Sequence, residues 1–94
     1  MSDSEVWDRI GQLLEFPVEF PIKVMGLRVE GFAQAITDLV CERLPEFDAS
    51  SVELRSSSNG KWLSITLMVR APSRDVLQSL YQELSRHPMV RVVL

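Results

Sequence analysis

Cysteine and histidine, the side chains on which most metal centres and many catalytic sites depend, are almost absent from this sequence. One of each occurs among the 94 residues. A disulfide framework, a zinc site of cysteines and histidines, and nearly all Cys/His catalytic pairs therefore lack their parts. Because no second cysteine is present, Cys41 is expected to be an ordinary thiol at the flank of a helix. We expect a protein that is not an enzyme and holds no metal or other cofactor.

Long hydrophobic runs are missing as well. The longest uncharged and mostly apolar stretch covers residues 62–69, far short of the roughly 20 residues that cross a bilayer as a helix. Acidic residues, Asp3 and Glu5, stand where a secretory signal would carry positive charge before an apolar segment. We therefore expect a cytoplasmic protein that does not associate with membranes.

Basic residues are too few for a surface that binds nucleic acid without sequence preference. Ten Lys and Arg stand against thirteen Asp and Glu, which gives a net charge of −3. Non-specific binding to nucleic acid needs a basic field that neutralises phosphates. A chain of this length forms one small domain, and we do not expect that domain to bind nucleic acid.

What the sequence does contain is a regular succession of hydrophobic patterns. Apolar residues at helical spacing predict three helices, and alternating apolar and polar residues predict four strands. The predicted helices cover residues 4–14 and 32–44 and the stretch between Ser73 and His87. The predicted strands cover residues 18–25, 50–57, 61–71 and 89–94. Between the second and third strands, Asn59 and Gly60 suit a type I′ hairpin turn, because both accept positive φ.

The order of these elements predicts the fold. After the first helix it reads strand, helix, strand, strand, helix, strand, which is the ferredoxin-like pattern. Right-handed crossovers place the first and third strands in the middle of a four-stranded antiparallel sheet and both later helices on one face. We predict an α+β sandwich in which residues 1–15 form an N-terminal helical extension and residues 16–94 form a single ferredoxin-like domain.

Short segments along most of the chain resemble one bacterial family. These segments are Leu14–Pro17, Pro21–Gly26, Ser57–Lys61, Ser64–Thr66, Leu80–Leu84 and Val90–Leu94. Together they are similar to the YbeD-like family of small bacterial proteins of unknown function. The resemblance implies a βαββαβ fold like that of ACT regulatory domains. It implies no catalytic or ligand-binding residues, because the family has no assigned activity.

The first candidate site is the loop after the first strand. Gly26 and Gly31 have the spacing of the ends of a phosphate loop, but Phe32 and Ala33 stand where Lys and Ser or Thr are needed. A plain connection between strand and helix is one interpretation. The resemblance to ACT domains implies another, in which the glycine lets backbone N–H groups approach a small effector, typically an amino acid, at a domain interface. The residues of that ligand-binding site would be Gly26, Leu27 and Arg28.

The second candidate site is the sheet face opposite the two later helices. Basic and apolar side chains gather on it, and such a face rarely stays bare. Three coverings remain open: the first helix through Trp7 and Ile10, a second copy of the chain, or another protein. A face that reads RNA needs aromatic side chains on both central strands, and Trp62 is the only aromatic residue in this set. The residues expected on this face are Lys23, Met25, Arg55, Trp62, Thr66, Met68, Arg70, Met89, Arg91 and Val93.

A third group of polar residues surrounds Pro45. Glu42, Glu46 and Asp48 are close in sequence, and we expect solvated carboxylates rather than metal ligands or an acid/base pair.

These observations favour a small regulatory or binding module that acts through a protein partner or a small ligand. An ACT-like effector domain for an amino acid or metabolite, an accessory subunit of an enzyme, and a nucleic-acid-binding domain are the alternatives.

The third strand supplies a direct test of the predicted core. Ile65 lies at its centre among alternating apolar residues, so Ile65→Ala should lower the free energy of unfolding by about 2–5 kcal/mol. Urea unfolding measures this loss. A loss below about 1 kcal/mol would place Ile65 outside the core.

Overall fold

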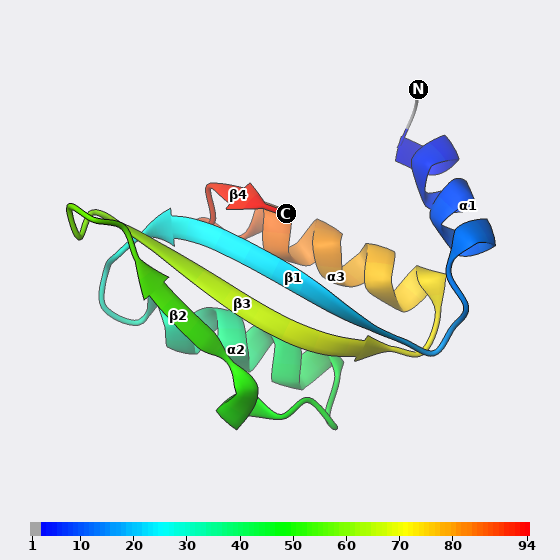
Figure 1. The fold of residues 1–94 in the computed structure, drawn as a ribbon, viewed down its shortest axis with the longest axis horizontal. Helices are drawn as coiled ribbons and strands as arrows, with labels where there is room; N and C mark the ends of the chain where they lie inside the picture. Colours follow the sequence, from blue (N-terminus) through cyan, green and yellow to red (C-terminus); the bar gives the residue numbers. More distant parts are fainter. Residues whose placement is uncertain (1–2) are drawn as a thin grey trace.

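Two ten-residue strands form the centre of the sheet. In the computed structural model, which describes residues 3–94, β1 (Val18–Leu27) and β3 (Trp62–Ala71) pair antiparallel over their whole length. Their side chains alternate between the two faces, and the set on one face is buried. Ile65, in the middle of that set, has no exposed surface. The pair runs across the molecule in Figure 1.

Two short strands border this pair. β2 (Glu53–Ser56) pairs with β3, and β4 (Val92–Val93) pairs with β1, all antiparallel. The strand order is therefore β2-β3-β1-β4. The predicted ferredoxin-like α+β fold is confirmed, including the central position of the first and third strands.

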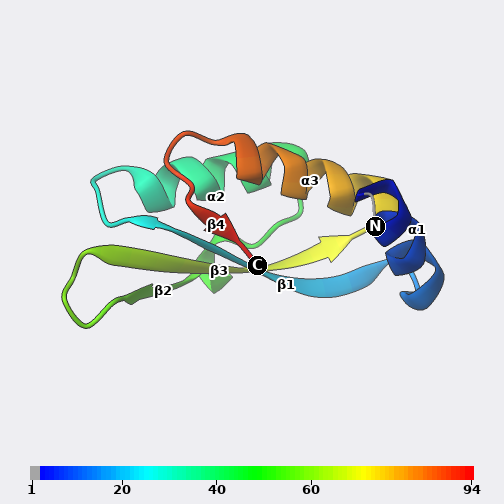
Figure 2. The same ribbon diagram turned by 90° about the horizontal axis from the view of Figure 1, so that it is seen from above.

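Two helices cover one face of the sheet. α2 (Phe32–Arg43) and α3 (Arg74–Arg86) lie side by side above it in Figure 2. Ser73 caps α3 by accepting a hydrogen bond from the N–H of Val76 at 3.2 Å. The core lies between the helices and the sheet and consists of Ile22, Val24, Phe32, Ile36, Val40, Leu63, Ile65, Leu67, Val69, Ala71, Leu77, Leu80 and Leu84.

The first helix, α1 (Asp3–Leu13), packs beside α3 instead of covering the open side of the sheet (Figure 2). The ring of Trp7 meets the ring of Tyr81 edge to face, with centroids 5.6 Å apart, and Asp8 forms an ion pair with Arg74. The hypothesis that this helix covers the open sheet face is therefore wrong. Residues 1–2 of the predicted extension lie outside the described residues.

Pro21 fits into a central strand because β4 is short. The N–H of Lys23 donates to the carbonyl of Leu94 at 3.1 Å, so the odd-numbered residues of β1 direct their backbone groups toward β4. Pro21 lies two residues before Lys23, where β4 no longer runs alongside. Its missing N–H therefore interrupts no ladder.

The hairpin turn differs from the prediction. Gly60 has a φ of 72°, and no non-glycine residue among those described has positive φ, so Asn59 and Gly60 do not form a type I′ turn. The register explains the difference: the N–H of Ser57 donates to the carbonyl of Trp62, and that of Gly60 donates to the carbonyl of Ser57. The loop is thus longer than two residues. The Asn59 side chain accepts hydrogen bonds from the Lys61 N–H and the Ser57 hydroxyl.

The last strand is shorter than predicted, and its side chains point to the faces opposite to those predicted. Val93 lies opposite Val24 and packs on the core, whereas Val92 lies opposite Met25 on the open side. Met89 also packs on the core. Met89 and Val93 therefore do not belong to the open sheet face. The reason is that residues 89–94 are apolar at both alternating positions, so packing and not pattern decides which side is buried.

The second strand is also shorter than predicted. Residues 49–51 form a 3-10 turn, and Asp48 caps it by accepting a hydrogen bond from the N–H of Ser50 at 3.0 Å. Because this turn takes the place of the first residues of the predicted strand, β2 begins only at Glu53 and reaches only Thr66 on β3.

Gly26 is required by packing. A Cβ at this position would lie 2.3 Å from the carbonyl oxygen of Met89 and 2.7 Å from the ring of Phe32. Gly26→Ala should therefore lower the free energy of unfolding by about 1–3 kcal/mol in urea unfolding. Lys23→Ala, on the exposed side of the same strand, is the control, with an expected change within about 0.5 kcal/mol. Equal stability of both variants would contradict this packing role.

Candidate functional site

The open face is the side of the sheet opposite α2 and α3. It is built from cross-strand neighbours, so each side chain has a defined partner beside it. On the central strands the pairs are Leu27 with Trp62, Met25 with Ser64, Lys23 with Thr66, Pro21 with Met68, and Glu19 with Arg70. β2 adds Glu53 beside Thr66 and Arg55 beside Ser64.

Charge on the open face is opposite in sign to that of the rest of the chain. Three basic residues (Lys23, Arg55 and Arg70) and two acidic ones (Glu19 and Glu53) give 3 − 2 = +1, so the remainder of the chain carries −3 − 1 = −4. Within residues 3–94, the ion pairs use only the basic groups of Arg43 and Arg74. The three basic groups of the open face are therefore available to an acidic surface.

Apolar side chains separate these charges. Met68 is 47% exposed and Trp62 is 39% exposed, and the ammonium group of Lys61 lies 5.3 Å from the centre of the Trp62 ring. In the part of the chain that the structure describes, no helix covers this face (Figure 2). Lys23 and Thr66 lie at the middle of the ladder and Trp62 lies at its hairpin end, so apolar and charged side chains are mixed over the face. Protein-binding surfaces that form transient complexes have such a mixed composition.

Six of the predicted partner-binding residues lie together on the open face: Lys23, Met25, Arg55, Trp62, Thr66 and Arg70. Arg91 lies at the β4 edge, where its N–H donates to the carbonyl of Met25 at 2.8 Å and its side chain is exposed. Partner binding by these residues stays a prediction.

The loop predicted to bind an effector does not have free backbone beside Gly26. Gly26 and Leu27 belong to β1, and the ring of Phe32 fills the space beside Gly26. The N–H of Arg28 donates to the carbonyl of Lys61, and its guanidinium donates to the carbonyl of Gly60. These groups tie the loop to the β2–β3 hairpin. Ligand binding by Gly26, Leu27 and Arg28 stays a prediction, but the open space beside Gly26 on which it rested is occupied.

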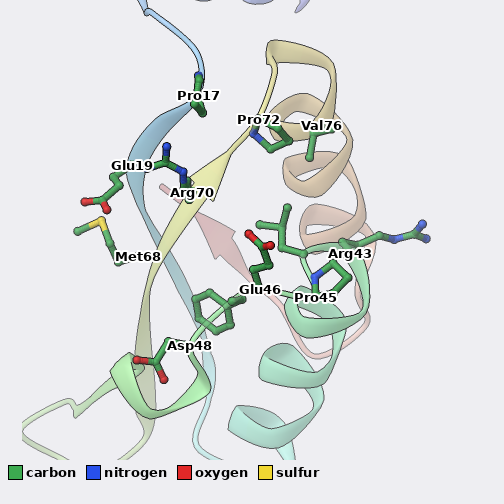
Figure 3. A pocket seen from close by; sticks show the side chains of 12 residues that line it. Pro17, Glu19, Arg43, Pro45, Glu46, Asp48, Met68, Arg70, Pro72 and Val76 are labelled. Atoms are coloured by element: carbon green, nitrogen blue, oxygen red, sulfur yellow. The ribbon is translucent and has the colours of Figure 1, made fainter.

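A cleft along the free edge of β3 is a site that the sequence did not indicate. It has a volume of about 630 Å³ and lies between the end of β3, the connection from α2 to β2, and the start of α3 (Figure 3). Met68 and Arg70 line the strand side, and Phe47 and Glu46 line the opposite side. The only sequence signal here was the group of carboxylates near Pro45.

The carboxylates near Pro45 have separate surroundings. Asp48 accepts hydrogen bonds from the hydroxyl and the N–H of Ser50, and these bonds lower the pKa of its carboxyl group. Glu46 points into the cleft, whereas Arg43 points away from it and pairs with Glu83 (Figure 3). Across residues 3–94, no three His, Cys, Asp or Glu side chains gather in a way that could hold a metal ion.

A second cavity, of about 400 Å³, lies between α1, β1 and α3. Its lining is almost entirely apolar and includes Trp7, Leu14 and Phe20. Tyr81 borders it, and burial raises the pKa of the Tyr81 phenol. The phenol donates a hydrogen bond to the carbonyl of Leu94 at 3.2 Å, so its polar end is satisfied.

None of the helices described between residues 3 and 94 has the length and apolar character that a bilayer crossing requires.

The fold is also found in a solved ACT domain. The chain superimposes on the ACT domain from the GTP pyrophosphokinase of Chlorobium tepidum with a TM-score of 0.56 and 21% sequence identity, over 82% of this chain and 97% of that domain. At this identity the likeness concerns the fold.

Sequence comparison identifies much nearer relatives. A UPF0250 protein of Bordetella pertussis is 51% identical over 82 residues, which cover 87% of this chain and 90% of that protein. A UPF0250 protein of Nitrosomonas europaea is 48% identical over 82 residues, with 87% and 94% covered. The model of the family described as "Protein of unknown function (DUF493)" matches residues 11–94. The resemblance to a small bacterial family of unknown function is thus confirmed, and the chain belongs to this DUF493 (UPF0250) family.

Proposed function

We propose that this chain is a non-catalytic regulatory module that binds a protein partner through its open face. The observation that carries the proposal is the open face itself, a sheet surface of mixed apolar and charged side chains that no helix of residues 3–94 covers. The partner presents an acidic surface, which complements Lys23, Arg55 and Arg70. The module works in the cytoplasm, because a chain with one free cysteine, Cys41, suits a reducing compartment.

The size of the open face favours a transient complex. Ten-residue strands extend over about 33 Å, and four strands about 4.8 Å apart give a width of at most about 19 Å. A flat area of roughly 600 Å² per partner lies at the low end of specific interfaces, where transient signalling contacts are found. Regulation requires such reversible binding.

The likeness to an ACT domain supports the regulatory part of the proposal. The matching domain of Chlorobium tepidum comes from an enzyme, GTP pyrophosphokinase. A domain of this fold can therefore form part of an enzyme. We infer that the partner here is an enzyme or another effector protein and that this chain is its accessory subunit.

A quantitative binding experiment tests the open face. The chain is used to capture proteins from an extract of the organism that encodes it, the captured protein is purified, and its Kd is measured by calorimetry. Arg55 lies opposite Ser64 on the open face, and Trp62 is the next side chain of β3 on that face. Trp62→Ala with Arg55→Glu should therefore weaken binding at least about tenfold.

Leu13→Ala with Arg86→Glu is the matched control, since both side chains are exposed and lie on α1 and α3. The control should bind within about twofold of the natural chain. A control that loses binding as strongly as the open-face variant, or an open-face variant that binds unchanged, would overturn the proposal. Catalytic activity of the purified chain alone would overturn its non-catalytic part.

A further inference from the structure

β3 has an unpaired backbone edge over its C-terminal half. β2 pairs with it only as far as Thr66, whereas β3 continues to Ala71. The carbonyl of Trp62 accepts a hydrogen bond from Ser57 on the β2 side, and backbone groups change direction at every residue of a strand. Met68 and Arg70 therefore direct their N–H and C=O groups to that same side. Among residues 3–94, no strand lies there to pair with them.

The cleft in Figure 3 lies along this edge. In most proteins an exposed edge of a sheet is kept from pairing with another chain by an inward charge, a proline within the strand or a covering loop. Here the connection from α2 to β2 stands away from β3 and encloses a space of about 630 Å³. Leu44, Phe47 and Val76 are the apolar residues on the helix side of this space, and Glu46 adds a carboxylate that points into it (Figure 3).

The backbone N–H and C=O groups of Met68 and Arg70 have the spacing that pairs with an extended chain. A strand that lies antiparallel to β3 would sit about 4.8 Å away and would continue the line of β2 toward Pro72. Its side chains would alternate in direction. Those opposite Val69 and Ala71 would point into the cleft toward its apolar lining, and those opposite Met68 and Arg70 would join the open face, while Val52 of the chain itself lies beside Leu67.

Arg70 favours a guest strand with a negatively charged side chain beside it. Its cross-strand neighbour on β1 is Glu19, but neither side chain is part of an ion pair in the described structure. A guest strand on the other side of β3 would place a side chain next to the guanidinium at the distance of a cross-strand pair. An acidic side chain there is attracted to Arg70, and a basic one is repelled.

We propose that this cleft accepts an extended peptide segment of a partner protein, which adds as a strand to β3 with apolar side chains inward and an acidic side chain beside Arg70. This contact uses backbone atoms at the edge of the sheet, and it shares the side chains of Met68 and Arg70 with the open face.

The experiment uses a four-residue probe, acetyl-Ile-Glu-Val-Thr-amide, which ends before the place of Val52. Laid antiparallel to β3, it places its glutamate beside Arg70 and its threonine beside Met68. Hydrogen exchange of the full chain is followed by NMR. Without the probe, the Met68 and Arg70 amides should exchange faster than those of Leu67 and Val69, which face β1. A saturating amount of the probe should slow exchange at Met68 and Arg70 at least about tenfold.

Two modified probes separate strand addition from other contacts. N-methylation of the glutamate and threonine removes the two N–H groups that face β3 and should abolish the protection. Replacement of the glutamate by lysine should weaken binding at least about fivefold, and Arg70→Glu in the protein should reverse the preference between these two peptides. Glu46→Gln, on the opposite wall of the cleft, is the matched protein control and should retain the preference for the glutamate peptide.

Three results would overturn the proposal. The first is equal binding of the N-methylated probe. The second is the absence of slowed exchange at Met68 and Arg70 when the probe is in excess. The third is slow exchange of both amides without any probe at concentrations where the chain sediments as a dimer, because a second copy would then occupy the edge. The open-face variant Trp62→Ala with Arg55→Glu leaves the cleft intact, so loss of partner binding by that variant and failure of strand addition are separate outcomes.

Discussion

The full-length antiparallel pairing of β1 with β3 is the interaction on which the rest of the structure depends. Ten residue pairs, from Val18 with Ala71 to Leu27 with Trp62, fix the register. A shift by one residue would turn every buried side chain of one strand to the open face. The register therefore sets both the core under α2 and α3 and the composition of the open face. Gly26 shows how tightly the core is fitted, because the ring of Phe32 and the carbonyl of Met89 occupy the place of a side chain.

The edge strands contrast with this central pair. β2 has four residues and β4 has two, so each leaves part of a long strand without a neighbour. On β1 the bare part contains Pro21, which has no N–H to offer. On β3 the bare part contains Met68 and Arg70, which keep both backbone groups. The two edges thus differ in chemistry: the β1 edge lacks a donor at its centre, and the β3 edge can form a complete ladder. This difference makes the β3 edge the more specific acceptor for another chain.

The sequence predicted the fold where its patterns have one interpretation. From residue 63 to residue 71 every odd position is apolar and most even positions are polar, and the strand was found over Trp62–Ala71. The pattern failed to predict the buried face of residues 89–94, because both alternating positions are apolar there. It also failed to predict the start of β2, because the Asp48 side chain binds the backbone and caps the turn that shortens this strand. The open face followed from alternation and was largely predictable. The cleft was not, because it results from the end of a ladder and from the path of a loop, which no periodicity records. Gly26 was interpreted as a place for a ligand, but a single sequence does not tell whether a glycine admits a ligand or the chain's own phenylalanine.

Met68 and Arg70 belong to both surfaces. Their side chains lie on the open face and their backbone groups face the cleft. A strand added to β3 would widen the open face by about 4.8 Å along its C-terminal half and would place a carboxylate beside Arg70. The guanidinium would then be neutralised and less available to an acidic partner on the open face. By reciprocity, a partner that already pairs with Arg70 lowers the affinity of the cleft for an acidic strand by the same factor. If both proposed contacts form, they share one arginine and are coupled through its charge.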